Sequence, residues 1–322
     1  MHTVHRLLLF LALVACTLSV LHAELKDVVF TPQWIPQNQF AGFYVAKEKG
    51  FYEQEGLNVK FRHIGINSKK TSLQILQEGK ADIAGLQLLQ AIAARSKGAP
   101  IVNVCQITQI SGLWVVAHRP ISEPKDLNHM HVARWQFGHA ELFDVLCHEF
   151  NLDLETVPFS HNLSLFTYDA VDATLCYSFN EYLRLLLAVG RIPEEHVLRC
   201  HDHLPRTPED GLYVTEEYYK ANKDTIDAFV RASKKGWEYT AEHMEEACAI
   251  AHKYIEAGHV SSNPAMERMM LKEFLHLLVN PASGMRDFAQ VPEDVFNRLV
   301  DSMYRAALIQ KPVSYHEMIH HE

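Results

Sequence analysis

The chain has 322 residues, of which 48% are hydrophobic and 21% are charged, and its formal net charge is −9 at pH 7. The length is sufficient for two lobes with their own hydrophobic cores, and the composition is typical of a soluble globular protein. An acidic chain without a run of Lys or Arg argues against a nucleic-acid partner, because the phosphate backbone attracts basic surfaces.

The first 23 residues predict an export signal. Their apolar run at residues 7–15 is too short to span a bilayer. Two processing routes compete: a lipoprotein-like motif would leave a lipid-anchored Cys16 as the N-terminus, whereas ordinary signal peptidase would cut after Ala23. The apolar run continues through Leu21, which favours cleavage after Ala23 and a periplasmic or otherwise extracytoplasmic location.

The stretch at residues 31–55 is the most informative part of the chain. An apolar run at residues 28–31 predicts a strand, two prolines bracket the turn after it, and helical spacing begins at Gln39 and ends at Gly50. A second strand is expected at residues 57–61. Ligands of open α/β sheets bind at the carboxyl ends of strands, so the loop after the first strand is a candidate binding loop. It offers one aromatic plane and several amides, namely Gln33, Trp34, Gln37, Asn38 and Gln39.

Further along, short apolar strands alternate with helices, which is typical of parallel βαβ units. Residues 110–117 contain glycine and tryptophan and run into a proline, so we expect a crossing between lobes there. From Glu216 onward the pattern is helical. We therefore predict a signal peptide at residues 1–23, a first lobe at residues 24–117 plus 205–322, and a second lobe at residues 118–204. The helices predicted last in the chain lie at residues 224–243, 245–257, 265–278 and 293–307.

The chain resembles the periplasmic solute-binding superfamily that includes the thiamine-pyrimidine synthases and the pyrimidine- and riboflavin-binding proteins of ABC importers. The resemblance covers roughly residues 26–243 and implies a two-lobed α/β fold, the type II periplasmic-binding-protein fold, with the ligand cleft between the lobes. The residues that carry it are Trp34, the runs at residues 40–52 and 56–59, and the weaker matches at residues 79–83 and 171–173.

Trp34 is the strongest single candidate for ligand contact. A tryptophan between two prolines is poorly placed for a core, and its face suits stacking on a heteroaromatic ring; packing between the lobes is the alternative. Gln39 and Phe40 lie in the same loop and helix start, and Tyr44 follows Phe40 by one helical turn. For Phe40 and Tyr44, packing in the core is an equally good interpretation.

Four further candidates lie after other predicted strands or at the proposed crossing. Gln87 either hydrogen-bonds a ligand edge or caps a helix, and Trp114 either contacts ligand or fills the hinge. Gly138 and His139 form a turn at a helix N-terminus, where free backbone N–H groups can hold an anion. His139 is otherwise a surface histidine.

Asn180 and Glu181 are polar residues in an apolar neighbourhood after a predicted strand. A carboxylate can accept from an exocyclic amine and a protonated ring nitrogen together, which an aminopyrimidine requires, and the resemblance implies an acidic residue near this place. The alternative is an acid that serves the helix dipole.

Cysteine and histidine predict no metal site or cofactor. Five cysteines remain after Cys16, with no CxxC spacing, and we expect small buried hydrophobic residues or at most one disulfide, for instance between Cys176 and Cys200. The histidine-rich C-terminus at residues 316–322 is expected to be a solvated tail.

These observations favour an exported binding protein that captures a small heteroaromatic compound, related to a thiamine pyrimidine or a vitamin precursor, for an ABC permease. The alternatives are a ligand-sensing receptor for a sensor kinase and a synthase-like enzyme. Against an enzyme, the CCCFC-type motif that the resemblance implies for the synthases is absent, because Cys200 is followed by His201, and no nucleophile–base pair is evident.

Overall fold

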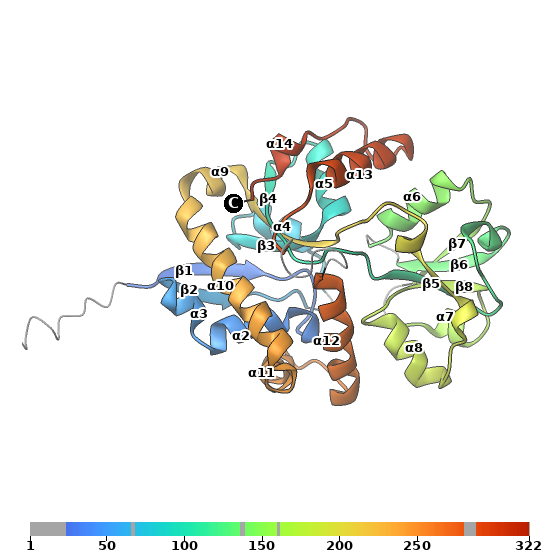
Figure 1. Ribbon diagram of the computed structural model, residues 1–322, viewed down its shortest axis with the longest axis horizontal. Helices are drawn as coiled ribbons and strands as arrows, with labels where there is room; N and C mark the ends of the chain where they lie inside the picture. Colours follow the sequence, from blue (N-terminus) through green and yellow to red (C-terminus); the bar gives the residue numbers. More distant parts are fainter. Residues whose placement is uncertain (1–23, 66–67, 136–138, 160–161, 280–287, 322) are drawn as a thin grey trace, which may run out of the picture.

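The computed structural model describes residues 24–65, 68–135, 139–159, 162–279 and 288–321. Figure 1 shows two lobes side by side, each built on one five-stranded sheet with helices around it. The α/β, two-lobed architecture predicted from the sequence is therefore confirmed. The predicted export segment and Gly138 lie outside the described residues.

The first sheet has the strand order β2-β1-β3-β10-β4. β1 pairs in parallel with β2 and β3, as expected for βαβ units, whereas β10 is antiparallel to β3 and β4. β10 is the strand that returns after the second lobe, so the two halves of the chain are joined inside this sheet. The strands are β1 (Lys26–Thr31), β2 (Leu57–Phe61), β3 (Ile83–Gln87), β4 (Ile101–Gln106) and β10 (Asp210–Thr215).

The second sheet repeats this pattern with the order β7-β6-β8-β5-β9. Its antiparallel strand is β5, which pairs with β8 and β9, while β6 pairs in parallel with β7 and β8. Each sheet thus receives one antiparallel strand next to a chain crossing. The strands are β5 (Leu113–Ala117), β6 (His131–Trp135), β7 (Glu155–Phe159), β8 (Ala173–Tyr177) and β9 (Val197–Arg199).

The position of β5 corrects the expected lobe boundary. We placed residues 113–117 in the first lobe, but Leu113 pairs with Tyr177 and Ala117 with Ala173 in the second sheet. The first crossing therefore spans residues 107–112, and the second spans residues 200–209. The β-branched pair Val115 and Val116 is buried in this sheet, which explains why the segment forms a strand.

The helices α2 and α10 pack very closely on the side of the first lobe that carries the binding loop. Gly42 lies against the ring of Trp237, so closely that a Cβ there would meet the indole at 2.2 Å, and Gly236 approaches the Gly42 carbonyl in the same way. Only glycine allows this contact between α2 and α10. The helices of this side are α2 (Ala41–Glu48), α3 (Phe51–Gln54), α10 (Lys223–Glu242) and α11 (Met244–Ala257), preceded by the 3₁₀ turn η1 (Asn38–Phe40).

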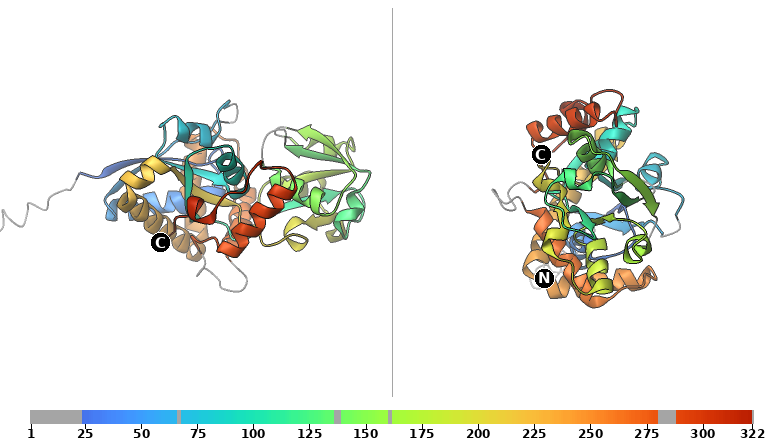
Figure 2. Two further views of the ribbon diagram at one scale, coloured as in Figure 1. Left: turned by 90° about the horizontal axis from the view of Figure 1, so that it is seen from above. Right: turned by 90° about the vertical axis from the view of Figure 1, so that its right-hand side faces the viewer.

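The C-terminal helices of the first lobe also contact the second lobe. α12 packs against α8, and α13 packs against α6; Figure 2 shows α13, in orange-red, along one side of the molecule between the lobes. The predicted C-terminal helices are present, with ends shifted by a few residues. The remaining helices are α4 (Ser72–Gln77), α5 (Leu88–Ser96), α6 (Glu141–Glu149), α7 (Ser164–Thr167), α8 (Glu181–Val189), α9 (Glu216–Ala221), α12 (Pro264–Leu278), α13 (Glu293–Arg305) and α14 (Tyr315–Met318).

The C-terminus is not the solvated tail that we expected. Met318 and Ile319 are buried, Ile319 forms a bridge with Asn103 of β4, and His321 Nε2 lies 2.6 Å from Asn103 Oδ1. Burial lowers the pKa of His321 to about 4. The apolar pair within the histidine-rich segment therefore docks on the first sheet and carries the histidines with it.

The five cysteines from Cys105 onward are unpaired in the structure, and Cys176 and Cys200 are both buried. The burial of Cys105, Cys176 and Cys200 is as expected for small hydrophobic residues, whereas Cys147 and Cys248 are only partly buried. Within the described part of the chain, no helix has both the length and the apolar character needed to cross a bilayer.

Candidate functional site

A cavity of about 1520 Å³ lies between the lobes and is lined by residues of both. The first lobe contributes the loop after β1 and Gln87 at the end of β3. The second lobe contributes Trp135 at the end of β6 and Tyr177 at the end of β8, followed by residues 179–181. The carboxyl ends of parallel strands from both sheets therefore converge on one space.

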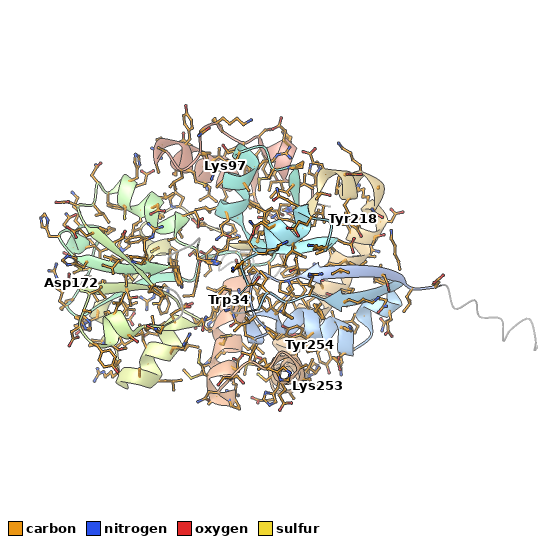
Figure 3. All side chains as sticks on the ribbon, turned by 180° about the vertical axis from the view of Figure 1, so that it is seen from behind. Trp34, Lys97, Asp172, Tyr218, Lys253 and Tyr254 are labelled. Carbon is orange, nitrogen blue, oxygen red and sulfur yellow. The ribbon has the colours of Figure 1, made fainter. Side chains whose placement is uncertain are left out.

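Trp34 lies in the wall of this cavity, half-buried, near the middle of the molecule (Figure 3). Its ring meets His139 edge-on, with 6.4 Å between the centroids, so the contact crosses from one lobe to the other. The Trp34 carbonyl oxygen is 3.1 Å from His63 Nδ1, which fixes the backbone of the loop. The sequence prediction that Trp34 is available to a ligand fits this position.

Gln39 and Gln87 also line the cavity. Gln87 occupies the N-cap position of α5, but its side chain makes no capping hydrogen bond. It instead donates from Nε2 to Tyr177 Oη at 2.5 Å, across the lobe interface. The helix-cap interpretation of Gln87 is therefore wrong for its side chain.

Phe40 and Tyr44 do not line the cavity and belong to the core. Their exposed fractions are 2% and 0%. Tyr44 stacks on Tyr254 of α11, with ring centroids 4.1 Å apart, and its hydroxyl lies 3.0 Å from His63 Nε2. His63 and Tyr254, which do line the cavity, cover these rings from the cleft side, so the core interpretation applies.

Trp114 is also absent from the cavity wall. It lies on β5 in edge-on contact with Tyr182, at 4.8 Å between centroids, and the Arg199 guanidinium sits over its ring at 4.9 Å. In the register of β5, Trp114 is paired with Cys176 of β8 and Arg199 of β9, and it is not among the residues that line the cavity. The prediction that Trp114 contacts ligand is therefore replaced by a packing role.

His139 lies in the cavity wall between two indoles. Its ring is 6.4 Å from that of Trp34 and 6.3 Å from that of Trp135, and its φ of +62° places it in the left-handed region. Burial lowers the pKa of His139 to about 4, so the imidazole is neutral at pH 7. It is part of the site rather than the surface residue that we considered as the alternative.

Asn180 and Glu181 line the cavity at the start of α8. Glu181 Oε2 accepts from the Tyr177 backbone N–H at 3.1 Å, and Oε1 accepts from Asn180 Nδ2 at 3.2 Å. Burial raises the pKa of Glu181. The Glu181 carboxylate thus hydrogen-bonds the turn before α8 and also lines the cavity, and ligand contact by Glu181 stays a prediction.

An aromatic wall in the second lobe was only partly anticipated. Trp135 and Tyr177 stack with centroids 5.2 Å apart at 28°, and Tyr177 and Phe179 stack at 5.3 Å and 29°. The sequence analysis singled out Asn180 and Glu181, the polar residues next to Tyr177 and Phe179, and did not name the aromatic residues as site residues. Two of these three residues end strands, and that position was the available signal.

The sequence analysis missed two buried acids at the second crossing. Glu209 accepts from the Gly112 N–H at 2.9 Å and from Tyr177 Oη at 3.4 Å, and Asp210 accepts from Gln39 Nε2 at 2.6 Å. Burial raises the pKa of Glu209 to about 8 and that of Asp210 to about 6. An acidic pair in a predicted connection gives no sequence signal of burial.

The site combines aromatic faces from both lobes with amides from the first. Flat rings can stack on the aromatic residues, and the amides Gln33, Gln37, Gln39 and Gln87 can hydrogen-bond a ring edge. Among the described residues, no group of three or more His, Cys, Asp or Glu side chains is arranged to hold a metal ion. The arrangement suits reversible binding of a flat, polar-edged molecule.

The family described as NMT1/THI5 like matches residues 37–247 of this chain. Three relatives align with this chain over most of their length. A riboflavin-binding protein, RibY, of Chloroflexus aurantiacus is 23% identical over 92% of this chain and 86% of its own. A formylaminopyrimidine-binding protein of Halalkalibacterium halodurans is 23% identical over 85% of each chain. A 4-amino-5-hydroxymethyl-2-methylpyrimidine phosphate synthase of Aspergillus parasiticus is 20% identical over 82% of this chain and 80% of its own.

Solved structures share the fold. The periplasmic aliphatic sulphonate binding protein SsuA of Escherichia coli superposes with a TM-score of 0.69 at 16% identity, over 92% of each chain. At this identity the likeness concerns the fold alone.

Proposed function

This chain belongs to the NMT1/THI5-like family, and from that premise we propose that it is a solute-binding protein that captures a small heteroaromatic compound between its lobes. The observation that carries the proposal is the cavity itself, whose walls come from strand ends of both lobes and combine stacked aromatic rings with amides. Such a site holds a flat ring by its faces and reads its edge by hydrogen bonds.

The proposed ligand class is a thiamine-pyrimidine-like compound or a related vitamin precursor. Two relatives are named for binding riboflavin and formylaminopyrimidine, which supports heterocycles with polar edges. We further propose that the chain is exported, works outside the cytoplasm and delivers its ligand to an ABC permease. Delivery to a sensor kinase is the alternative, and permease genes beside the coding gene would separate the two.

An enzyme of the synthase type is the second candidate, because two relatives carry that name. Cys200 is followed here by His201 and Asp202 in place of a cysteine-rich motif, and its thiol is fully buried with a raised pKa. A buried thiol of this kind is unreactive. These features favour binding over catalysis.

A thermal-shift screen tests the proposal. The mature chain from Glu24 would be heated with 4-amino-5-hydroxymethyl-2-methylpyrimidine, with riboflavin and, as a non-aromatic control, with an alkanesulfonate. Binding of a heterocycle to the folded state should raise the melting temperature, and the rise should grow with the logarithm of ligand concentration above the Kd. A rise with the alkanesulfonate alone would contradict the proposed ligand class.

A further inference from the structure

A row of three buried side chains runs from the first residue of β10, directly after the second crossing, to the cavity. Asp210 Oδ2 accepts a hydrogen bond from Gln39 Nε2 at 2.6 Å, and Gln39 Oε1 accepts one from Gln37 Nε2 at 2.6 Å. The three residues are only 5–7% exposed. Gln37 and Gln39 line the cavity, whereas Asp210 does not. We refer to Asp210, Gln39 and Gln37 as the amide relay.

The charge on Asp210 fixes the direction of the amide relay. An amide can present either its oxygen or its nitrogen to a neighbour, but a carboxylate accepts only. Gln39 must therefore turn its NH₂ group toward Asp210, which leaves its carbonyl oxygen for the Gln37 NH₂ group. The Gln33 side chain also hydrogen-bonds Asp210, so a second amide is oriented by the same carboxylate.

Asp210 is itself rigidly held. Its backbone N–H donates to Thr108 Oγ1 at 2.9 Å, and its carbonyl oxygen accepts from Gln106 Nε2 at 2.8 Å. Burial raises the pKa of Asp210 to about 6, so the carboxylate is still ionised at pH 7. The direction of the amide relay therefore holds at neutral pH.

Gln37 Oε1 is the free end of the amide relay. No described residue donates a hydrogen bond to this oxygen. The polar atoms that are both fully enclosed and without a partner do not include it, so it keeps some accessible surface. Because Gln37 lines the cavity, this oxygen is reachable from inside it. The cavity thus presents a hydrogen-bond acceptor whose orientation is decided by a side chain that the ligand does not touch.

We propose that the amide relay makes the site select heterocycles that carry an N–H or O–H donor on the edge facing Gln37, with Asp210 as the positioning residue that sets this preference. The inference rests on the proposed function and adds that the ligand must donate a hydrogen bond at this edge. A ligand without the donor leaves a buried acceptor unsatisfied, which is costly.

The test compares matched ligand pairs by calorimetry. The pairs are riboflavin with N3-methylriboflavin, and 4-amino-5-hydroxymethyl-2-methylpyrimidine with its 4-dimethylamino analogue. The wild-type protein should bind at least one parent tenfold or more tightly than its methylated partner. In Asp210→Asn the amide at residue 210 can donate as well as accept, so the hydrogen-bond direction of the amide relay can reverse. The ratio of the affinity for the parent to the affinity for its methylated partner should therefore fall by at least threefold.

A second variant guards against misfolding. Gln39→Met interrupts the amide relay and leaves Asp210 in place, and it should reduce the same ratio. Asp294→Asn is the matched control, because Asp294 is a surface residue of α13 paired with Arg298, and it should keep the wild-type ratio. An unchanged affinity ratio in Asp210→Asn would mean that the methylated ligands bind weakly because of steric exclusion. That result would overturn this inference and leave the proposed function standing. Failure to bind either parent would overturn the proposed function together with it.

Discussion

Gln87 of the first lobe donates a 2.5 Å hydrogen bond to Tyr177 Oη of the second lobe, at the edge of the cavity. The same hydroxyl lies 3.4 Å from Glu209 Oε1 on the second crossing. The Tyr177 hydroxyl, at a strand end of the second lobe, therefore contacts both a strand end of the first lobe and the second crossing. This relationship links closure of the lobes to the binding site.

Tyr177→Phe should loosen the lobes of the unliganded protein. The loss removes hydrogen bonds worth about 0.5–1.5 kcal/mol each, enough to shift a balance between open and closed forms. Small-angle scattering of the free variant should show a larger radius of gyration than the wild type. Tyr168→Phe is the control, because Tyr168 is 83% exposed in the second lobe. Equal radii for Tyr177→Phe and Tyr168→Phe would contradict a bridging role.

Trp34→Ala and Glu181→Gln should each weaken ligand binding by about tenfold or more, since about 1.4 kcal/mol corresponds to a factor of ten. Stacking and a charged hydrogen bond contribute on that order. Calorimetry with the ligand found in the thermal screen measures the effect.

Matched variants separate binding from packing in this experiment. Trp114→Ala removes an indole that packs on Tyr182 away from the cavity, so it should lower the melting temperature and leave affinity unchanged. Glu194→Gln changes an exposed carboxylate that pairs with Arg199 and should change neither quantity. Normal affinity in both Trp34→Ala and Glu181→Gln would show that these residues only pack.

Local sequence was sufficient for the strand ends and hence for part of the site. Trp34, Gln87 and Glu181 each follow or end a strand that apolar patterning predicts, and all three line the cavity. The general convergence of strand ends in an α/β fold brought them together. No knowledge of distant contacts was needed for these positions.

The remaining side chains depend on contacts between distant segments. Tyr44 faces Tyr254, which follows it by 210 residues, so its orientation cannot be inferred from α2 alone. Trp114 takes its direction from pairing with Cys176 and Arg199. Asp210 is buried only because β10 inserts between β3 and β4, a placement that the charge pattern does not reveal.

Export remains a prediction from the first 23 residues. Mass spectrometry of the protein recovered from the native host should show a chain that begins at Glu24, or one that begins at a lipid-modified Cys16. The two products differ in mass and in solubility, so one experiment separates the processing routes. Recovery of the intact chain from Met1 in the cytoplasm would refute both.

The dependence of stability on pH should change in Glu209→Gln. Burial raises the pKa of Glu209 to about 8 in the folded protein, whereas an unfolded glutamate titrates near its ordinary value of about 4.3. The folded state therefore binds the proton more tightly, so this residue favours folding most below the unfolded pKa. Its contribution to the free energy of unfolding is lost as the pH rises through about 8.

A glutamine at position 209 has no proton to lose and retains an oxygen for the Gly112 N–H. Relative to the wild type, Glu209→Gln should therefore gain stability between pH 5 and pH 8. Denaturant unfolding at the two pH values measures the gain as a difference of differences. Buried histidines such as His63, whose pKa is lowered to about 4, act in the opposite direction but are common to both proteins and cancel. A stability difference between variant and wild type that is the same at both pH values would show that Glu209 is already ionised in the folded protein at pH 5.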